Sequence, residues 1–189
     1  MSSNGQSEQS LYGGAMTVIL PPQAIDVSQI RDVPDNQEVF THNVTDQSII
    51  FDILEYIEEP DHQAIQSHFQ EVAEYNKASD NDVTKIISIE EISKDELLLT
   101  ECTKAYYVLG QQKVAKFNET AKNLMNLHLG LFRLPQFSTD ILITSNDPVI
   151  ISPESSSHNA IPTSADRWTV MDIKRVITSL KLLDTGLFE

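Results

Sequence analysis

The sequence predicts an α/β fold, a sandwich in which helices pack on the faces of one mainly antiparallel sheet. Two patterns lead to this prediction. Apolar residues recur at helical spacing in two segments of the first half and again near the C-terminal end. Between residues 84 and 145, segments of strand length follow one another, separated by Gly, Asn or Pro. Strands that follow one another with short links favour an antiparallel meander.

The N-terminal part is expected to hold a tail and two short strands. Residues 1–10 are mostly Ser, Asn, Gln and Gly, which predicts a flexible tail followed by one globular domain over residues 11–189. Residues 15–20 predict a short strand that ends at two prolines, and residues 38–41 predict a second one. Residues 24–34 between them are expected to form an irregular crossing or a helical turn.

A first helix is predicted after Thr45 or Asp46. Either side chain can accept a hydrogen bond from the free backbone N–H groups at a helix start. On such a helix Asp52, Glu55 and Glu59 fall on the outward face, and the proline that follows them ends the helix. Its apolar stripe consists of Ile49, Ile50, Ile53, Leu54 and Ile57.

Two further helices are predicted from the same spacing. One covers residues 62–77. Its inward face consists of Ile65, Phe69, Val72 and, as a further candidate, Tyr75. The other starts near Thr169, where Asp172 stands three positions on in the manner of a capping box. The apolar stripe of this last helix consists of Val170, Ile173, Ile177 and Leu180.

The second half of the chain is dominated by strands. The expected strands cover residues 84–92, 97–109, 111–117, 121–132 and 138–145. The fourth of them alternates clearly between two faces. One face carries Met125, Leu127, Leu129 and Leu131, and the other carries Asn126, His128 and Gly130. A Pro/Ser-rich loop over residues 147–167 separates the strands from the last helix.

The composition is that of an acidic globular protein. Hydrophobic residues make up 40% of the 189 residues, which is enough for a sizeable core. The net charge of −15 repels nucleic acid and anionic membrane surfaces and attracts basic proteins. No apolar run approaches the ~20 residues that span a bilayer, and the polar start is no signal peptide. These features predict a soluble intracellular protein that binds no nucleic acid and does not insert into a membrane.

An acidic stretch is the most informative feature for function. From Asp32 to Asn76 the chain has eleven acidic residues and no lysine or arginine. At its head, Asp32, Asp35 and Glu38 lie on a segment whose proline and asparagine predict an ordered turn that runs into a strand. Carboxylates on an ordered turn suit docking to a basic partner. We favour this interpretation over acid–base catalysis by Asp35 and Glu38.

The residues that bind metals in other proteins form no convincing pattern here. Cys102 is the single cysteine, which excludes an internal disulfide and a cysteine-built metal site. His62 and His68 are six positions apart, whereas two ligands on one helix face are three or four apart. No metal or other cofactor is therefore expected.

Three other features admit two interpretations each. Lys113, Lys116 and Lys122 form either a local basic patch or, as we favour, the ordinary solvent face of a sheet. Trp168 is either an interface anchor or a hydrophobic staple over the start of the last helix. A serine run beside His158 places a hydroxyl next to an imidazole, but without a nucleophile-elbow pattern we expect a polar loop.

Several ordered motifs together resemble the Ran guanine nucleotide release factor family. They begin with Leu-Tyr-Gly-Gly-Ala at residues 11–15 and end with Asp-Thr-Gly-Leu-Phe at residues 184–188. Between these lie residues 20–22, 25–26, 33–39 (Val-Pro-Asp-Asn-Gln-Glu-Val, with Arg31 before them), 45–50, 131–137, 139–144 and 176–180. Residues 62–101 and 147–167 match poorly, so the resemblance implies nothing about them.

The resemblance implies both a fold and a function. The family fold is an α/β/α sandwich with a curved, mainly antiparallel sheet, similar to PsbP. Members bind the GTPase Ran and promote guanine nucleotide release in nuclear transport, as GTPase regulators and not as enzymes. Vertebrate members are linked to surface delivery of a voltage-gated sodium channel. The resemblance assigns Ran binding to Asp35 and Glu38, with Asp32 as a neighbour. We expect a monomer, present in nucleus and cytoplasm.

Two alternatives remain beside the Ran nucleotide-release factor. The first is a binding adaptor or trafficking factor without exchange activity, which could use the same acidic surface. The second is a small hydrolase or lyase that uses Asp35 and Glu38. It predicts a concave pocket around these two residues and a raised pKa on one of them.

Overall fold

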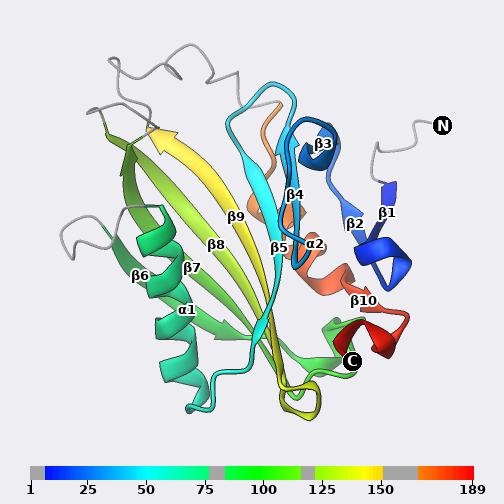
Figure 1. The fold of residues 1–189 in the computed structure, drawn as a ribbon. Helices are drawn as coiled ribbons and strands as arrows, with labels where there is room; N and C mark the ends of the chain where they lie inside the picture. The colour runs from blue at the N-terminus through cyan, green and yellow to red at the C-terminus, as the bar shows by residue number, and fades with distance from the viewer. Residues whose placement is uncertain (1–6, 77–83, 116–121, 151–165) are drawn as a thin grey trace.

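A curved, antiparallel sheet of seven strands forms the centre of the protein (Figure 1). The computed structural model describes residues 7–76, 84–115, 122–150 and 166–189. The sheet order is β3-β4-β5-β9-β8-β7-β6, in which β6 to β9 form the predicted meander. The strands are β3 (Ala24–Asp26), β4 (Gln37–His42), β5 (Ser48–Glu55), β6 (Thr84–Glu91), β7 (Lys104–Ala115), β8 (Lys122–Leu134) and β9 (Thr139–Ile150).

Two α-helices in the described residues cover opposite faces of this sheet (Figure 1). Helix α1 (Asp61–Tyr75) packs Ile65 and Phe69 against the apolar row of β8 that the alternation predicts. Helix α2 (Val170–Ser179) packs on the other face. A small antiparallel sheet lies beside α2 and consists of β1 (Ser7–Leu11), β2 (Met16–Leu20) and β10 (Lys181–Leu182). The layers confirm the predicted α/β/α sandwich.

The ends of several elements differ from the prediction. Residues 7–10 belong to β1 and pair with β2, although their composition predicts a flexible tail. The predicted crossing consists of β3 and a 3₁₀ turn over Val27–Gln29. Strand β9 runs on to Ile150, into the predicted loop, and residues 151–165 of that loop lie outside the described ranges. No helix in the described ranges is long and apolar enough to cross a bilayer.

The start of α2 follows the predicted capping box. Asp172 N donates to the Thr169 hydroxyl at 3.2 Å, and Thr169 N donates to the Asp172 carboxylate at 2.8 Å. These bonds satisfy two N–H groups that have no partner within the helix. Val170 is exposed, and Val176 joins the buried face in its place.

The helix predicted after Thr45 or Asp46 is wrong, because these residues lead into strand β5. Strand β5 lies inside the sheet, between β4 and β9, and both of its faces are covered. Ile49 and Phe51 pack toward α2, whereas Leu54 packs toward α1. A strand buried on both faces loses the alternation of polar and apolar residues, and its apolar run then imitates a helical stripe.

The break predicted at Gly110 is also wrong, because β7 runs through it. A Cβ at this position would lie 2.2 Å from Phe69 Cε2, so the glycine allows α1 to approach the sheet closely. Tyr75, proposed for the inward face of α1, is 77% exposed, because the helix ends there and extends past the core.

Candidate functional site

The acidic turn ahead of β4 is ordered by backbone hydrogen bonds. Gln37 N donates to Pro34 O at 2.9 Å, which closes a tight turn around Asp35 and Asn36. Asn36 forms two hydrogen bonds to β5, one as acceptor and one as donor. Its carbonyl accepts from Ile53 N at 2.9 Å, and its side-chain amide donates to Ile53 O at 3.2 Å. The predicted ordered turn that runs into a strand is confirmed.

Asp32 and Asp35 are exposed, whereas Glu38 is half-buried. Glu38 Oε1 accepts a hydrogen bond of 2.6 Å from Tyr12 N, the first residue of the turn between β1 and β2. The Tyr12 hydroxyl donates to Phe51 O at 3.0 Å. The turn between β1 and β2 therefore supports the acidic turn. The sequence does not reveal this contact, because the two segments are distant along the chain.

Tyr12 adopts an unfavourable backbone conformation. Its φ of 50° lies in the left-handed region, which residues other than glycine adopt infrequently. Burial, together with the charges of Asp52 and Glu38, raises the pKa of its hydroxyl. The tyrosine therefore stays neutral and acts as a hydrogen-bond donor beside the turn.

A pocket of about 240 Å³ lies between β4, β5, β9 and α1. Side chains along a strand alternate between faces, so Gln37 and Asp52 line this pocket while Glu38 lies on the opposite face of the same sheet edge. We call it the Asp52 pocket. Its polar lining includes Arg31, Gln37, Asp52, His68, Glu71, Thr144 and Asn146.

Asp52 is the charged centre of this pocket. Its carboxylate accepts a hydrogen bond of 2.6 Å from Gln37 Nε2, and the residue is 9% exposed. Burial raises the pKa of Asp52 above its ordinary value, and the hydrogen bond from Gln37 and the charge of His68 oppose this shift. The prediction that Asp52 lies on the solvent face of a helix is wrong for the same reason as the helix itself.

Behind the pocket, a buried ionic network fastens α1 to the sheet. His68 Nε2 lies 2.9 Å from Asp140 Oδ2, and Arg133 Nε lies 3.0 Å from Asp140 Oδ1. The Arg133 guanidinium also packs 4.2 Å from the centre of the Tyr56 ring. Arg133 and Asp140 are fully buried, so this network positions α1 and presents no surface to a partner.

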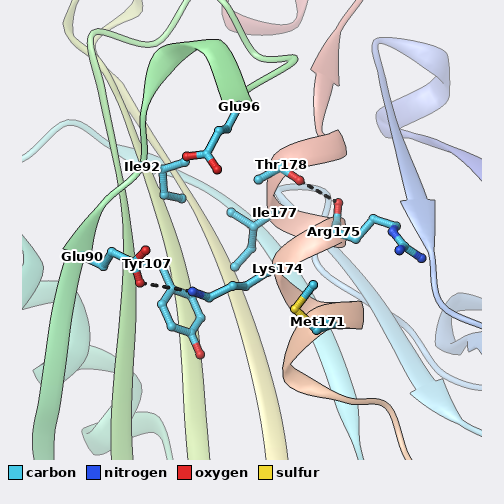
Figure 2. A pocket seen from close by; sticks show the side chains of 9 residues that line it. All are labelled: Glu90, Ile92, Glu96, Tyr107, Met171, Lys174, Arg175, Ile177 and Thr178. Carbon is cyan, nitrogen blue, oxygen red and sulfur yellow. Dashed lines mark hydrogen bonds and ion pairs between the residues drawn. The ribbon is translucent and has the colours of Figure 1, made fainter.

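A second pocket, of about 300 Å³, lies between β6, β7 and α2 (Figure 2). Lys174 extends across it, pairs with Glu90 at 3.1 Å and lies 4.6 Å from the centre of the Tyr107 ring. Since Lys174 and Glu90 neutralise each other, this pocket offers less electrostatic attraction to a charged ligand than the Asp52 pocket.

Trp168 is buried, so the interpretation of this residue as an interface anchor is wrong. Its ring Nε1 donates to Pro22 O at 2.7 Å, and its ring meets that of His42 at 5.1 Å between centroids. The Gln47 side chain bonds to both the N–H and the carbonyl of Trp168 at 2.9 Å. The tryptophan thus ties the start of α2 to the segments around β2 and β5.

The remaining candidates from the sequence are only partly described. Lys113 is exposed on β7, whereas the side chains of Lys116 and Lys122 and the serine run at His158 lie outside the description. His62 contacts Gln66 on the surface of α1, while His68 belongs to the buried network. Among the described residues, no group of three His, Cys, Asp or Glu could hold a metal ion.

Known proteins resemble this chain over nearly its whole length. The Ran guanine nucleotide release factor of Danio rerio is 48% identical over 183 residues, which cover 94% of this chain and 97% of the relative. The Ran guanine nucleotide release factor of Homo sapiens is 39% identical over 181 residues, which cover 94% of each chain. Both matches therefore extend over nearly the whole domain.

Solved structures match the fold. The crystal structure of the Saccharomyces cerevisiae Ran-binding protein Mog1p superposes with a TM-score of 0.73 at 24% identity, and the match covers 99% of this chain and 100% of that one. The cyanobacterial PsbP protein of Synechocystis gives a TM-score of 0.53 at 14% identity. The family described as Ran-interacting Mog1 protein matches residues 9–148. This chain therefore belongs to the Ran-interacting Mog1 protein family.

Proposed function

We propose that this protein binds the GTPase Ran and promotes release of its guanine nucleotide, and so acts in transport between nucleus and cytoplasm. Family membership and relatives named for this activity support the proposal. The observation that carries it in this chain is the ordered acidic turn, with Asp32 and Asp35 exposed and Glu38 fixed beside them.

The acidic turn suits the first step, which is encounter with a basic surface. A carboxylate patch on a protein of net charge −15 speeds association with a basic partner. Backbone hydrogen bonds hold the turn in one conformation, so little entropy is lost when the partner binds. Because Glu38 Oε1 is engaged by Tyr12, Oε2 is the oxygen that we assign to the partner.

Nucleotide release requires more than binding. A factor shifts the equilibrium only if it binds the nucleotide-free or distorted GTPase more tightly than the loaded one. We assign this difference to carboxylates that compete with nucleotide phosphate for a lysine of Ran or that disturb its Mg²⁺ site. Asp35 and Glu38 are the residues for this role, with Asp32 as a contributing neighbour.

The test is release of fluorescent GDP from Ran. We expect the wild-type protein to accelerate release and Asp35→Ala/Glu38→Ala to lose that acceleration, with affinity about 30-fold lower or more. Asp95→Ala/Glu96→Ala is the matched control, because it removes two charges from the turn after β6, the strand at the opposite end of the sheet. Equal release by all three proteins would contradict the proposal.

The adaptor alternative makes a different prediction in the same assay. A protein that binds Ran without changing the nucleotide off-rate would be an adaptor, and delivery of a sodium channel stays a prediction of that kind. The enzyme alternative finds no support in the pocket next to the turn, because Gln37 and Asp52 line it rather than Asp35 and Glu38. We expect a monomeric regulator that is present in both nucleus and cytoplasm.

A further inference from the structure

We propose that the Asp52 pocket receives the basic end of a lysine or arginine side chain from the partner GTPase. The inference rests on the proposed function and extends it to a second contact. The acidic turn and the Asp52 pocket lie at one edge of the sheet, since Gln37 belongs to both the turn and the pocket lining. A partner that binds at this edge can therefore contact the acidic turn on one face of the sheet and the Asp52 pocket on the other.

The pocket is rich in groups that accept hydrogen bonds. Asp52 and Glu71 supply carboxylate oxygens, Thr144 a hydroxyl and Asn146 a carbonyl oxygen. An ammonium or guanidinium group only donates hydrogen bonds, so it matches such a set. Against the two carboxylates stand Arg31, which is exposed, and His68, which is paired with Asp140 at 2.9 Å. The balance of charge therefore favours a cation as the occupant.

Two of these acceptors are buried without a hydrogen-bond partner among the described residues. Thr144 is 3% exposed and its Oγ1 has no hydrogen bond there, and Asn146 Oδ1 is in the same situation. Buried polar groups without partners cost free energy, and proteins tolerate few of them. Beside the pocket, each atom therefore keeps the capacity to accept a hydrogen bond from a donor.

The apolar part of the pocket fits the stem of such a side chain. Val39, Ile50 and Leu142 line the same space as Asp52. Lysine and arginine carry a long alkyl stem that packs on apolar surface while the charged head reaches a polar group. This combination of an apolar wall and a carboxylate fits a basic side chain better than a bare metal ion, which needs polar ligands all round.

The test compares Asp52→Asn with wild type in binding to Ran. Asn keeps the shape of the side chain and an oxygen for Gln37 but removes the charge. We expect the Kd for Ran to rise about 30-fold or more, the usual consequence of removing one partner of a desolvated charge pair. Thr144→Val is expected to raise it about tenfold. Glu90→Gln is the matched control in the second pocket and is expected to leave the Kd within about twofold.

A folding control accompanies these measurements. Because burial raises the pKa of Asp52, its charged form is disfavoured in the folded protein, and Asp52→Asn is expected to unfold at the same or a higher temperature. Weaker binding with undiminished stability would mark a role in binding. Lys→Ala and Arg→Ala variants of Ran then complete double-mutant cycles with Asp52→Asn, in which one of them is expected to show strong coupling.

The possible results separate the two proposals. If wild type binds Ran and Asp52→Asn binds equally well, the pocket inference is overturned while the proposed function stands. Absence of coupling with every basic residue of Ran would also overturn it. If wild type does not bind Ran, the proposed function fails and the pocket inference falls with it.

Discussion

Folding disfavours the charged form of the Asp52 side chain, because the carboxylate is buried. Burial raises its pKa, and Gln37 and His68 offset only part of that shift. For an acid with a raised pKa, the stabilisation is complete below the ordinary value of 3.8 and is lost as pH rises through the pKa of the folded state.

The first prediction concerns the pH dependence of Asp52→Asn. We expect its advantage in unfolding temperature over wild type to be small near pH 4 and to grow as pH rises toward 7, because only wild type must then bury a charge. Thermal unfolding of both proteins over this range measures the difference. An advantage that shrinks with rising pH would contradict this explanation.

The pKa of Asp147 is shifted in the opposite direction from that of Asp52. Burial by itself would raise its pKa, but the His128 ring and the Arg167 guanidinium, together with the hydrogen bond from Gln47, hold the pKa below its ordinary value. The stabilisation is therefore present above the ordinary value of 3.8 and is lost as pH falls through the lower pKa of the folded state.

The second prediction is that Asp147→Asn lowers the free energy of unfolding at pH 7 by about 1–3 kcal/mol. Its charge-assisted bond to Arg167 would be lost, although the amide keeps the shape of the side chain. Urea unfolding at pH 7 and below pH 4 provides the measurement. The deficit is expected to shrink at the lower pH, and a deficit that is equal at both values would count against the ionic cause.

At the scale of elements, close contact between helix and sheet depends on glycines in the strands. Gly130 on β8 faces α2, and a Cβ there would lie 2.8 Å from Ile177 Cγ1. Its neighbours on the same face, such as His128, are buried as well. Of the polar residues on this face of β8, His128 is buried and Asn126 is half-buried, so the face is not an ordinary solvent face.

The third prediction follows from this contact. Gly130→Ala is expected to destabilise the protein by about 1–3 kcal/mol, because the new methyl group overpacks the α2 interface. Gly130→Ala/Ile177→Ala, which makes room for the methyl group, is expected to lose less stability than the sum of the two single changes. Denaturant unfolding of the four proteins measures this coupling, and strict additivity would contradict the packing argument.

For the whole molecule, we expect charge to govern the rate at which the protein meets its partner. The net charge of −15 acts over distances comparable with the Debye length, which is about 8 Å at physiological salt. The fourth prediction is that association with Ran slows at least tenfold between 0.05 and about 0.5 M NaCl while dissociation changes much less. Stopped-flow measurements test this, and an association rate that is independent of salt would exclude steering.

Most of the fold could be predicted from local patterns. The meander, α2 with its capping box and the ordered acidic turn all depend on residues close together along the chain. Strand β5 could not be predicted in this way, because it lies inside the sheet with one face packed toward α1 and the other toward α2, which removes the alternation that identifies a strand. The break predicted at Gly110 is wrong for a similar reason. A glycine is needed there because Phe69 of α1, which is distant along the chain, occupies the space of a side chain.

Composition and neighbouring residues were enough to predict the class of protein, the acidic turn and the three carboxylates at its head, at positions 32, 35 and 38. The hydrogen bond from Tyr12 to Glu38 and the place of Asp52 in a pocket beside α1 depend on contacts between segments that are distant along the chain. Burial and hydrogen bonding between distant segments decide whether a carboxylate is solvated or poised to bind. Those quantities exist only after the chain has folded.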